Sequence, residues 1–479
     1  MPPTTRRRFL EAAGASAAAA ALGPADWARA ADRPNVVLIV VDTLRADHVL
    51  GNRARTPNMD ALARDGISFT RAYPEAMPTV AARNSILTGR RRFPSHTAPQ
   101  RRDLGDVPGW APLGNVGTSF TSILRRAGYW TAYATDNPFL GFSRAYRPFR
   151  RSFDVFARRG GQLGGTARGV SERELRHWLP RPLENGETRD RMRRYLANGG
   201  YSRDDSRSFA ARVFRDGMRL LDQGARRRPF ALVVDTFQPH EPWTPPQRYI
   251  DMYGDPDYRG PEPALPLYGR TGDRLGGRAE EVLPRRMRDL YAASVTMTDR
   301  WLGVFLDRLH DLQLERETVI VLVADHGFFL GERGWIGKIS ALLHPELTRV
   351  PLIVVDPRHR RAGRRSRYFA STHDIAPTVL SMVGLRVPPA MEGANLSRLF
   401  EGRRPRERDV AWGGYENSFY IRTGPWVLFG ENRLHNFHLF DRRRDPGERR
   451  NLAQDHRGKV RELHRAMRRR ADGRLPYYR

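Results

Sequence analysis

Two acids and a histidine follow hydrophobic runs at places where they could bind a metal ion. Asp42 follows a β-branched run over residues 35–41, and Asp325 and His326 follow a similar run over residues 318–324. Such runs are typical of strands in a parallel sheet buried on both faces. Ligands bind at the carboxyl ends of such strands. An isolated Asp there usually serves a turn, but the paired context predicts a divalent metal site.

A threonine with a basic neighbour forms a second candidate group. Thr79 follows Pro78 and precedes a helix predicted over residues 81–88, so it would lie at a helix N-terminus, where backbone N–H groups stabilise an anion. Arg83, four residues on, shares its helical face and could pair with an anionic group held at Thr79. A capping threonine would occupy the same place. Beside a metal, however, Thr79 becomes a candidate nucleophile and a fourth group facing the ion.

Three further basic residues are candidates for binding an anion or assisting a leaving group. His240 follows a strand predicted over residues 230–237, although a histidine bracketed by prolines can simply hold a loop. Lys338 is one of two lysines in a chain with 80 arginines, which indicates a need for a compact ammonium group. His96 has the least local support of the three.

The elements expected around these residues form an α/β fold. A further buried strand is predicted over residues 350–355, and helices over residues 58–65 and 286–312, from the helical spacing of their apolar side chains. Two stretches rich in Gly, Pro and Arg, residues 158–169 and 254–278, are expected to be loops over the sheet that shape substrate choice.

Length and the change in character after about residue 402 predict one large α/β domain over residues 31–402 and a small subdomain over residues 403–479. The 479 residues are 40% hydrophobic, which is enough for a sizeable core. The formal net charge of +29 comes from scattered arginines. A nucleic-acid binder would gather them on one face, so we expect anionic substrates and no nucleic-acid partner.

Residues 1–30 are predicted to be a twin-arginine signal peptide. Residues 5–10 read Thr-Arg-Arg-Arg-Phe-Leu, an alanine-rich apolar run follows over residues 12–22, and Ala28-Arg-Ala30 fits a cleavage site. The run is too short and too rich in alanine for a membrane anchor. We therefore expect a periplasmic or extracellular protein with no membrane-spanning segment after cleavage.

Taken together, these motifs resemble the sulfatase family within the alkaline phosphatase superfamily. The resemblance implies a central, mostly parallel sheet flanked by helices, with a small C-terminal α+β subdomain. The matching pieces keep the family order over residues 34–453: residues 35–47, 56–60, Gly66, 83–90, 239–242, 324–327, 337–338, 349–352, 374–378, 440–441, 445–446 and 451–453.

The resemblance also implies roles for the candidate residues. One divalent cation would be held by Asp42, Asp325, His326 and the nucleophile position, Thr79. The remaining four residues would bind the ester oxyanions or assist the leaving group: Arg83, His96, His240 and Lys338. The substrate would be an anionic small molecule or a glycan or lipid ester.

The chain departs from the family pattern in its nucleophile and its metal ligands. Thr79 stands where a sulfatase has the Cys or Ser that becomes formylglycine, and the chain contains no cysteine. Ala81 replaces the proline of the signature, and Thr43 stands where many sulfatases have a second metal-binding aspartate. We therefore expect no formylglycine. The family favours calcium, while the altered ligands leave manganese and zinc open.

Threonine changes the reaction that can complete turnover. Formylglycine releases sulfate by elimination, whereas an ester on Thr79 needs attack by water or an acceptor alcohol. Relatives with a threonine nucleophile do this on phosphorus. We expect a metal-dependent hydrolase of sulfate or phosphate esters. Two alternatives stay open: a phosphodiesterase or phosphotransferase acting only on phosphorus, and a protein that has lost catalysis and binds an anionic glycan. Neither the substrate nor the oligomeric state follows from the sequence.

Overall fold

The computed structural model describes residues 33–49, 53–95, 107–163, 165–433 and 435–478. The predicted signal peptide, residues 1–30, and the candidate His96 lie outside these ranges. Within them, no helix combines the length and the apolar character that crossing a bilayer requires.

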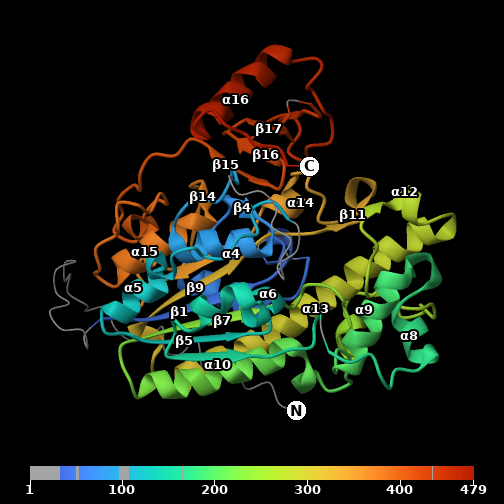
Figure 1. Ribbon diagram of the computed structural model, residues 1–479, viewed down its shortest axis with the longest axis horizontal. Coiled ribbons are helices and arrows are strands. Elements are labelled where there is room, and N and C mark those ends of the chain that lie inside the picture. Colours follow the sequence, from blue (N-terminus) through green and yellow to red (C-terminus); the bar gives the residue numbers. More distant parts are fainter. Residues whose placement is uncertain (1–32, 50–52, 96–106, 164, 434, 479) are drawn as a thin grey trace.

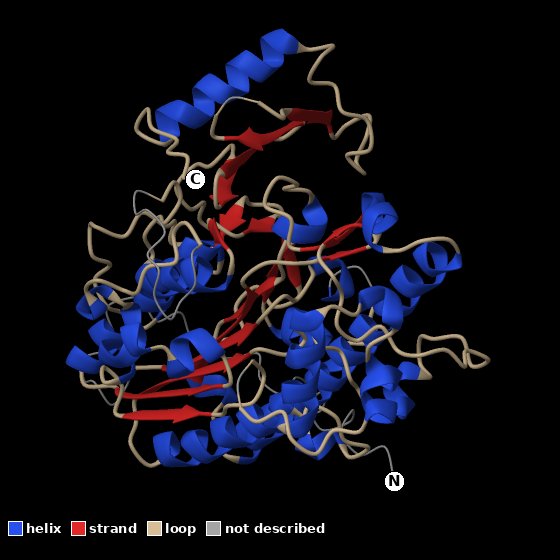
Figure 2. Ribbon diagram, turned by 45° about the vertical axis from the view of Figure 1, so that its right-hand side comes forward, coloured by secondary structure: helices blue, strands red, loops and turns tan. Residues whose placement is uncertain are grey.

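Runs of β-branched residues form the centre of an eight-stranded sheet (Figures 1 and 2). The strand β1 (Asn35–Val41) lies between β9 (Thr318–Ala324) and β7 (Phe230–Thr236) and is parallel to both. All three are buried along their whole length. The sheet continues in parallel through β5 (Trp130–Thr135) and β6 (Val155–Arg158). The prediction of a mostly parallel α/β sheet is confirmed.

The strands on the other side of β9, toward the opposite edge of the sheet from β6, include antiparallel pairs. Beyond β9 lie β12 (Leu352–Val355), β2 (Ile67–Phe69) and β13 (Arg364–Ser366). The strand β12 runs antiparallel to both β9 and β2. Its apolar run predicts a buried strand but carries no information about direction.

Helices cover both faces of the sheet, and several are amphipathic. In Figure 1, α10 and α13 lie below the sheet, while α4, α5 and α15 lie above it. The helix α13 begins at Arg278, before the predicted start at residue 286. Pro284 lies inside the helix, where it removes one backbone donor without ending it. The helices are α2 (Ala46–Val49), α3 (Pro57–Asp65), α4 (Thr79–Thr88), α5 (Phe120–Arg126), α6 (Pro138–Phe142), α7 (Arg147–Arg150), α8 (Glu172–Trp178), α9 (Gly186–Ala197), α10 (Phe209–Ala225), α11 (Gln247–Ile250), α12 (Thr271–Arg274), α13 (Arg278–Asp311), α14 (Pro345–Thr348), α15 (Ile375–Met382) and α16 (Arg457–Arg470).

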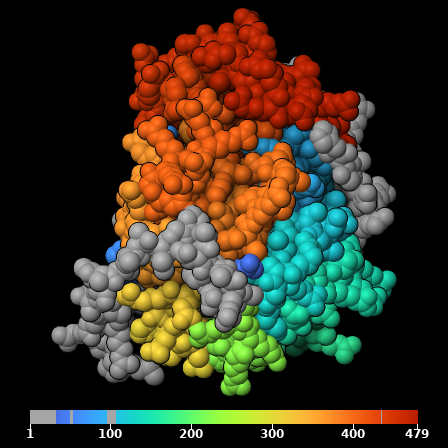
Figure 3. Space-filling model, turned by 90° about the vertical axis from the view of Figure 1, so that its left-hand side faces the viewer, coloured from blue at the N-terminus to red at the C-terminus, as the bar shows by residue number. Residues whose placement is uncertain are grey.

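A second, smaller sheet and α16 form the C-terminal part, which caps one end of the molecule (red in Figures 1 and 3). Its strands are β15 (Ala411–Tyr415), β16 (Ser418–Arg422), β17 (Trp426–Glu431) and β18 (His438–Asp441). The edge strand β4 (Ala76–Met77) pairs with β15 and leads directly into α4. The C-terminal sheet therefore supports the start of the helix that carries Thr79. The division at residue 402 stays a prediction.

Two small sheets complete the strands. One contains β10 (Phe329–Leu330), β11 (Trp335–Gly337) and β8 (Gly269–Arg270). The other pairs β3 (Ala72–Tyr73) with β14 (Ala370–Ser371). The predicted loop over residues 254–278 therefore contains β8 and α12, and β8 pairs with the strand that leads to Lys338.

Candidate active site

Strand register brings the predicted metal ligands together. The last residues of β1 and β9, Val41 and Ala324, are direct partners, so Asp42 and Asp325 leave the sheet side by side. One ligand atom from each of Asp42, Asp325 and His326 lies within 4.8 Å of the others. All three side chains are fully buried. A Cβ on Gly327 would lie 2.1 Å from the carbonyl oxygen of Glu346, so glycine is required where α14 packs against this turn.

The buried ligand atoms fit a cation. Asp42 Oδ2 and His326 Nε2 are buried and neither has a hydrogen bond among the described residues, although Asp42 Oδ2 forms an ion pair with Arg83. His326 Nδ1 lies 2.9 Å from the carbonyl oxygen of Gly327. Because that carbonyl can only accept, Nδ1 carries the proton and Nε2 keeps a free lone pair, which is the form that binds a metal.

Thr43 orders the two carboxylates. Its hydroxyl donates to Asp42 Oδ1 at 2.6 Å, and its amide donates to Asp325 Oδ1 at 2.9 Å. Thr43 has φ 61°, a left-handed conformation that is strained for a β-branched residue. This strained turn directs the amide at Asp325, so Thr43 positions the ligands without adding a carboxylate.

The site carries excess negative charge. Burial raises the pKa of Asp42, and the neighbouring Asp325 raises it further, against the opposing effects of Arg83 and Lys338. Burial also acts to raise the pKa of Asp325, but His326 and Arg83 outweigh it and the net direction is downward. A divalent cation between these side chains would remove the repulsion that holds Asp42 toward its neutral form.

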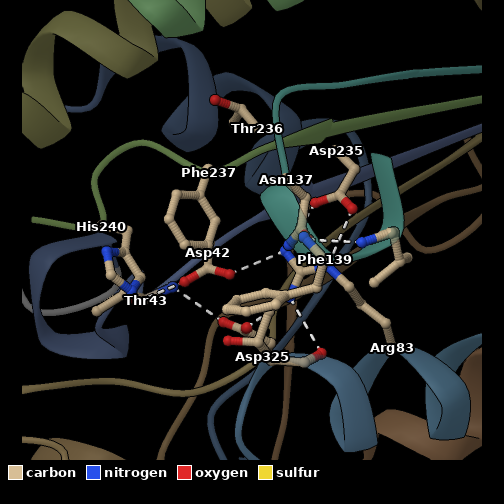
Figure 4. Close-up of polar contacts among 12 residues, drawn as sticks. Asp42, Thr43, Arg83, Asn137, Phe139, Asp235, Thr236, Phe237, His240 and Asp325 are labelled. Carbon is tan, nitrogen blue, oxygen red and sulfur yellow. Dashed lines mark hydrogen bonds and ion pairs between the residues drawn. The ribbon is translucent and has the colours of Figure 1, made fainter. Parts of the chain in front are cut away.

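Arg83 is held by three carboxylates, one of which the sequence analysis missed. Its Nε and Nη2 donate to Asp235 at 2.9 and 2.7 Å, and its Nη1 donates to Asp325 at 2.6 Å (Figure 4). Nη2 also lies 3.0 Å from Asp42 Oδ2. Burial opposes the charge of Arg83, but the three carboxylates raise its pKa above the ordinary value.

Asp235 lies inside β7 and is fully buried. It accepts from Tyr133 at 2.7 Å as well as from Arg83. An acid within a run of apolar strand residues is itself a signal, because a fully buried charge needs a partner. The sequence does not say that the partner lies 152 residues away.

Thr79 is the first residue of α4 and only 3% of its surface is exposed. Its carbonyl oxygen accepts from Arg83 Nη1 at 3.3 Å, and the same nitrogen donates to Asp325. One guanidinium therefore links the start of α4 to the metal ligands. All three nitrogens of Arg83 are engaged with these groups, so in this arrangement Arg83 positions the site rather than offering donors to an ester.

His240 and Lys338 form a second group. Lys338 Nζ lies 2.8 Å from His240 Nε2, and His240 Nδ1 lies 2.8 Å from the carbonyl oxygen of Glu241. Nδ1 is thus the protonated nitrogen, and Nε2 accepts from the ammonium. Burial lowers the pKa of His240, and the charge of Lys338 lowers it further, against the opposing charge of Glu241. The imidazole is therefore neutral.

A buried acid that the sequence analysis did not select holds this pair. Glu241 lies 3.8 Å from Lys338 Nζ and accepts from Tyr268 at 2.5 Å and from Arg191 at 3.3 Å. Tyr268 belongs to the predicted loop over residues 254–278, so this loop does reach the site. The sequence around Glu241, residues 239–242, signals this acid only weakly, because acids are common in loops.

Comparison with known proteins identifies the family of this architecture. The sulfatase family model matches residues 34–385. A second model, for the C-terminal region of N-sulphoglucosamine sulphohydrolase, matches residues 331–473 and so includes the C-terminal sheet.

Individual relatives are similar over most of their length. An arylsulfatase of Clostridium perfringens is 27% identical over 450 residues, which cover 88% of this chain and 90% of that protein. The multifunctional alkaline phosphatase superfamily protein PehA of Trinickia caryophylli is 27% identical over 490 residues, covering 88% and 92%. The phosphonate monoester hydrolase of Silicibacter pomeroyi has the same fold, with a TM-score of 0.69, 24% identity and coverage of 92% and 96%.

Proposed function

The chain belongs to the sulfatase family of hydrolases, and on this premise we propose that it cleaves sulfate or phosphate esters with unmodified Thr79 as the nucleophile. The observation that carries the proposal is the place of Thr79 at the first turn of α4, linked through Arg83 to Asp325. Backbone N–H groups at this turn stabilise a developing negative charge. The chain offers no cysteine that could become formylglycine.

Asp42, Asp325 and His326 are the residues that would hold a divalent cation, with Thr79 facing it. Such a cation lowers the pKa of the nucleophilic hydroxyl and offsets the charge on the transferred group. Two carboxylates with one imidazole suit manganese or zinc, whereas calcium takes oxygen ligands only. Calcium stays open because it is the metal that the family resemblance favours.

Turnover on threonine takes two displacements. In the first, Thr79 Oγ forms a bond to the sulfur or phosphorus, and the bond from that atom to the ester oxygen breaks. Lys338 gives a proton to the leaving oxygen, and the hydroxyl proton of Thr79 passes to solvent. In the second, water attacks the Thr79 ester, releases sulfate or phosphate and restores the hydroxyl, while Lys338 regains a proton from solvent.

The chemistry favours phosphorus, while the family name favours sulfur. An ester on Thr79 is hydrolysed only by attack on its central atom, which is the route taken by phosphoryl-transferring enzymes with covalent intermediates. Among the relatives one is named an arylsulfatase, and a protein of the same fold is a phosphonate monoester hydrolase. We include both esters in the proposal. The proposal includes export through the twin-arginine pathway, which rests on residues 1–30. It also includes an anionic small-molecule, glycan or lipid ester as the substrate.

A direct assay tests the proposal. Purified protein supplied with Ca²⁺, Mn²⁺ or Zn²⁺ is offered p-nitrophenyl sulfate, p-nitrophenyl phosphate and bis-p-nitrophenyl phosphate. We expect turnover of at least one ester that requires added metal and falls at least about 10³-fold in Thr79→Ala. Activity on phosphorus alone would select the phosphodiesterase or phosphotransferase alternative. Unchanged activity in Thr79→Ala would overturn the nucleophile assignment.

A further inference from the structure

A surface pocket of about 420 Å³ is lined almost entirely by arginines. Its volume falls within the range of small-ligand sites, roughly 300–1,000 Å³. None of the metal-binding or catalytic candidates takes part in the lining, which consists of Thr70, Arg71, Arg349, Arg365, Arg367 and Arg442.

Strand pairing brings these arginines together from distant parts of the chain. The strand β13 is parallel to β2, with Arg365 beside Ser68, so Arg365 and Arg367 flank the residues that follow β2. The amide of Thr70 donates to the carbonyl oxygen of Ser366 at 2.9 Å, which fixes this junction. Arg349 comes from the end of α14, and Arg442 from the turn after β18.

The cationic charge of the pocket is not balanced by acids. Within the described part of the chain, four of the arginines have no ion pair or side-chain hydrogen bond: Arg71, Arg349, Arg365 and Arg367. Arg442 lies 3.8 Å from Glu448, but Arg422 already engages that carboxylate in a closer, buried ion pair. Nε of Arg349 and Nε of Arg442 are buried and have no hydrogen-bond partner among the described residues.

Crowding of like charge also affects Arg71, which is half-buried. Burial lowers the pKa of Arg71, and Arg367 and Arg442 lower it further. By contrast, a second arginine-rich pocket, which includes Arg150 and Arg158, directs these side chains at carbonyl oxygens of Leu140, Ser143 and Gly141. The pocket at β13 keeps guanidinium groups for a ligand, because four of its five arginines have no ion pair or side-chain hydrogen bond among the described residues.

Guanidinium groups present paired N–H donors that match two oxygens of a tetrahedral anion. Several such groups around one cavity suit a sulfate or phosphate group better than a carboxylate, because the tetrahedral anion offers oxygens in more directions. Arg349 also places the pocket near the sheet edge that bears the metal ligands, since its carbonyl oxygen accepts from the amide of Ala46 at 3.4 Å.

We propose that this arginine pocket is a second anion site, which binds a sulfate or phosphate group that is either free or carried on a polyanionic chain. The proposal does not depend on catalysis at Thr79, because the lining shares no residue with that site. It gives the enzyme a way to hold one anionic group of a large substrate while another is cleaved, or to retain a released anion.

Binding measurements on two matched double variants test the site. Arg365→Gln with Arg367→Gln removes two exposed arginines of the pocket. Arg173→Gln with Arg181→Gln removes two exposed arginines elsewhere that form no ion pair within the described part of the chain, so both proteins lose the same charge. Titration of each full-length protein with inorganic sulfate and with dextran sulfate gives the dissociation constants, and turnover of a small p-nitrophenyl ester serves as a check on the catalytic site.

We expect the pocket variant to bind at least about tenfold more weakly, with the control variant and the small-ester turnover unchanged. Weaker binding of inorganic sulfate as well as of the polymer would show that the pocket takes a free anion. Weaker binding of dextran sulfate alone would show that the group must be carried on a chain. Equal losses of binding in the two double variants would overturn the proposal and attribute the binding to surface charge. No loss of binding in either variant would overturn it as well. The result is readable even if no ester is hydrolysed.

Discussion

Nζ of Lys338 lies 2.8 Å from Nε2 of His240. Because Nδ1 of His240 donates to the carbonyl oxygen of Glu241, Nε2 can only accept, and the ammonium keeps two further N–H groups for a ligand. In the proposed mechanism, this arrangement therefore makes Lys338, rather than His240, the candidate proton donor to a leaving oxygen. Tyr268 and Arg191 fix Glu241 on the other side of the pair.

The first prediction concerns this proton. Lys338→Arg keeps the positive charge but replaces an acid by a group that does not release its proton in proteins. We expect kcat for an alkyl ester, whose leaving oxygen needs a proton, to fall about 10²- to 10⁴-fold. A p-nitrophenyl ester leaves without one and should lose much less. Equal losses on both esters, measured in steady-state assays, would rule out Lys338 as the acid and leave it a role in binding.

The second prediction concerns the support of Arg83. Asp235→Ala leaves the buried guanidinium without its bidentate partner, which should lower the free energy of unfolding by about 3–5 kcal/mol. Tyr133→Phe is the matched control, because it removes only the other hydrogen bond to Asp235 and should cost about 1–2 kcal/mol. Urea denaturation of the two variants measures both. A similar, small loss in the two would mean that Asp235 is not the main partner of Arg83.

The third prediction concerns the metal. A cation bound only by the folded protein stabilises it by about 2.7 kcal/mol at a hundredfold excess over Kd. We expect added Mn²⁺ or Zn²⁺ to raise Tm in the parent protein and in Thr79→Ala, and a chelator to reverse the shift. Asp325→Asn should abolish it.

Direct metal analysis of the purified protein complements that measurement. A parent protein that neither contains nor takes up a divalent ion would contradict the metal site. It would instead favour the alternative that the fold binds an anionic glycan without catalysis.

Part of this site follows from the sequence because each hydrophobic run and the polar residue that ends it are local signals. The β-branched runs before Asp42 and Asp325 predict two buried strands of a parallel sheet, and the carboxyl ends of parallel strands lie at one edge of the sheet. That these two strands are direct neighbours is seen only in the structure. The lysine in an arginine-rich chain and the helix start at Thr79 are equally local signals. The sulfatase-family resemblance and the α/β fold are confirmed.

Other parts could not follow, because they depend on pairings between distant segments. Asp235 meets Arg83 across 152 residues, and Lys338 meets His240 across 98. The antiparallel direction of β12 is set by the path of the chain after α14, which a hydrophobic run does not encode. The prediction that Arg83 would contact an anion at Thr79 underestimated the carboxylates around it, because a helical face shows only the neighbours on its own helix.

The fourth prediction concerns acid stability. His373 is fully buried, and its Nδ1 lies 2.9 Å from the hydroxyl of Ser371. Burial lowers its pKa well below the ordinary value, and Arg91 and Arg408 lower it further, while Asp374 is 3.9 Å away. Above the unfolded pKa of about 6.5, the histidine is neutral in both states and adds no pH dependence.

Below that pH, His373 binds a proton in the unfolded chain but stays neutral in the folded protein. The free energy of unfolding should therefore fall by about 1.4 kcal/mol per pH unit from this group, until the folded pKa is reached. His373→Gln should reduce the slope by this amount, whatever its effect on absolute stability. Denaturation curves at several pH values below 6.5 measure it. The same slope in both proteins would mean that His373 already binds its proton in the folded state.

The central claim is that Thr79 carries the transferred group during turnover. Acid quenching during turnover of a fast-leaving ester, followed by peptide mass spectrometry, tests it most directly. We predict a sulfate or phosphate ester on Thr79 in the parent protein. In Lys338→Arg, the level of this ester should rise only if the substitution slows the attack of water on it. Active protein that never carries the group on the peptide containing Thr79, or that carries it on another residue, would contradict the account.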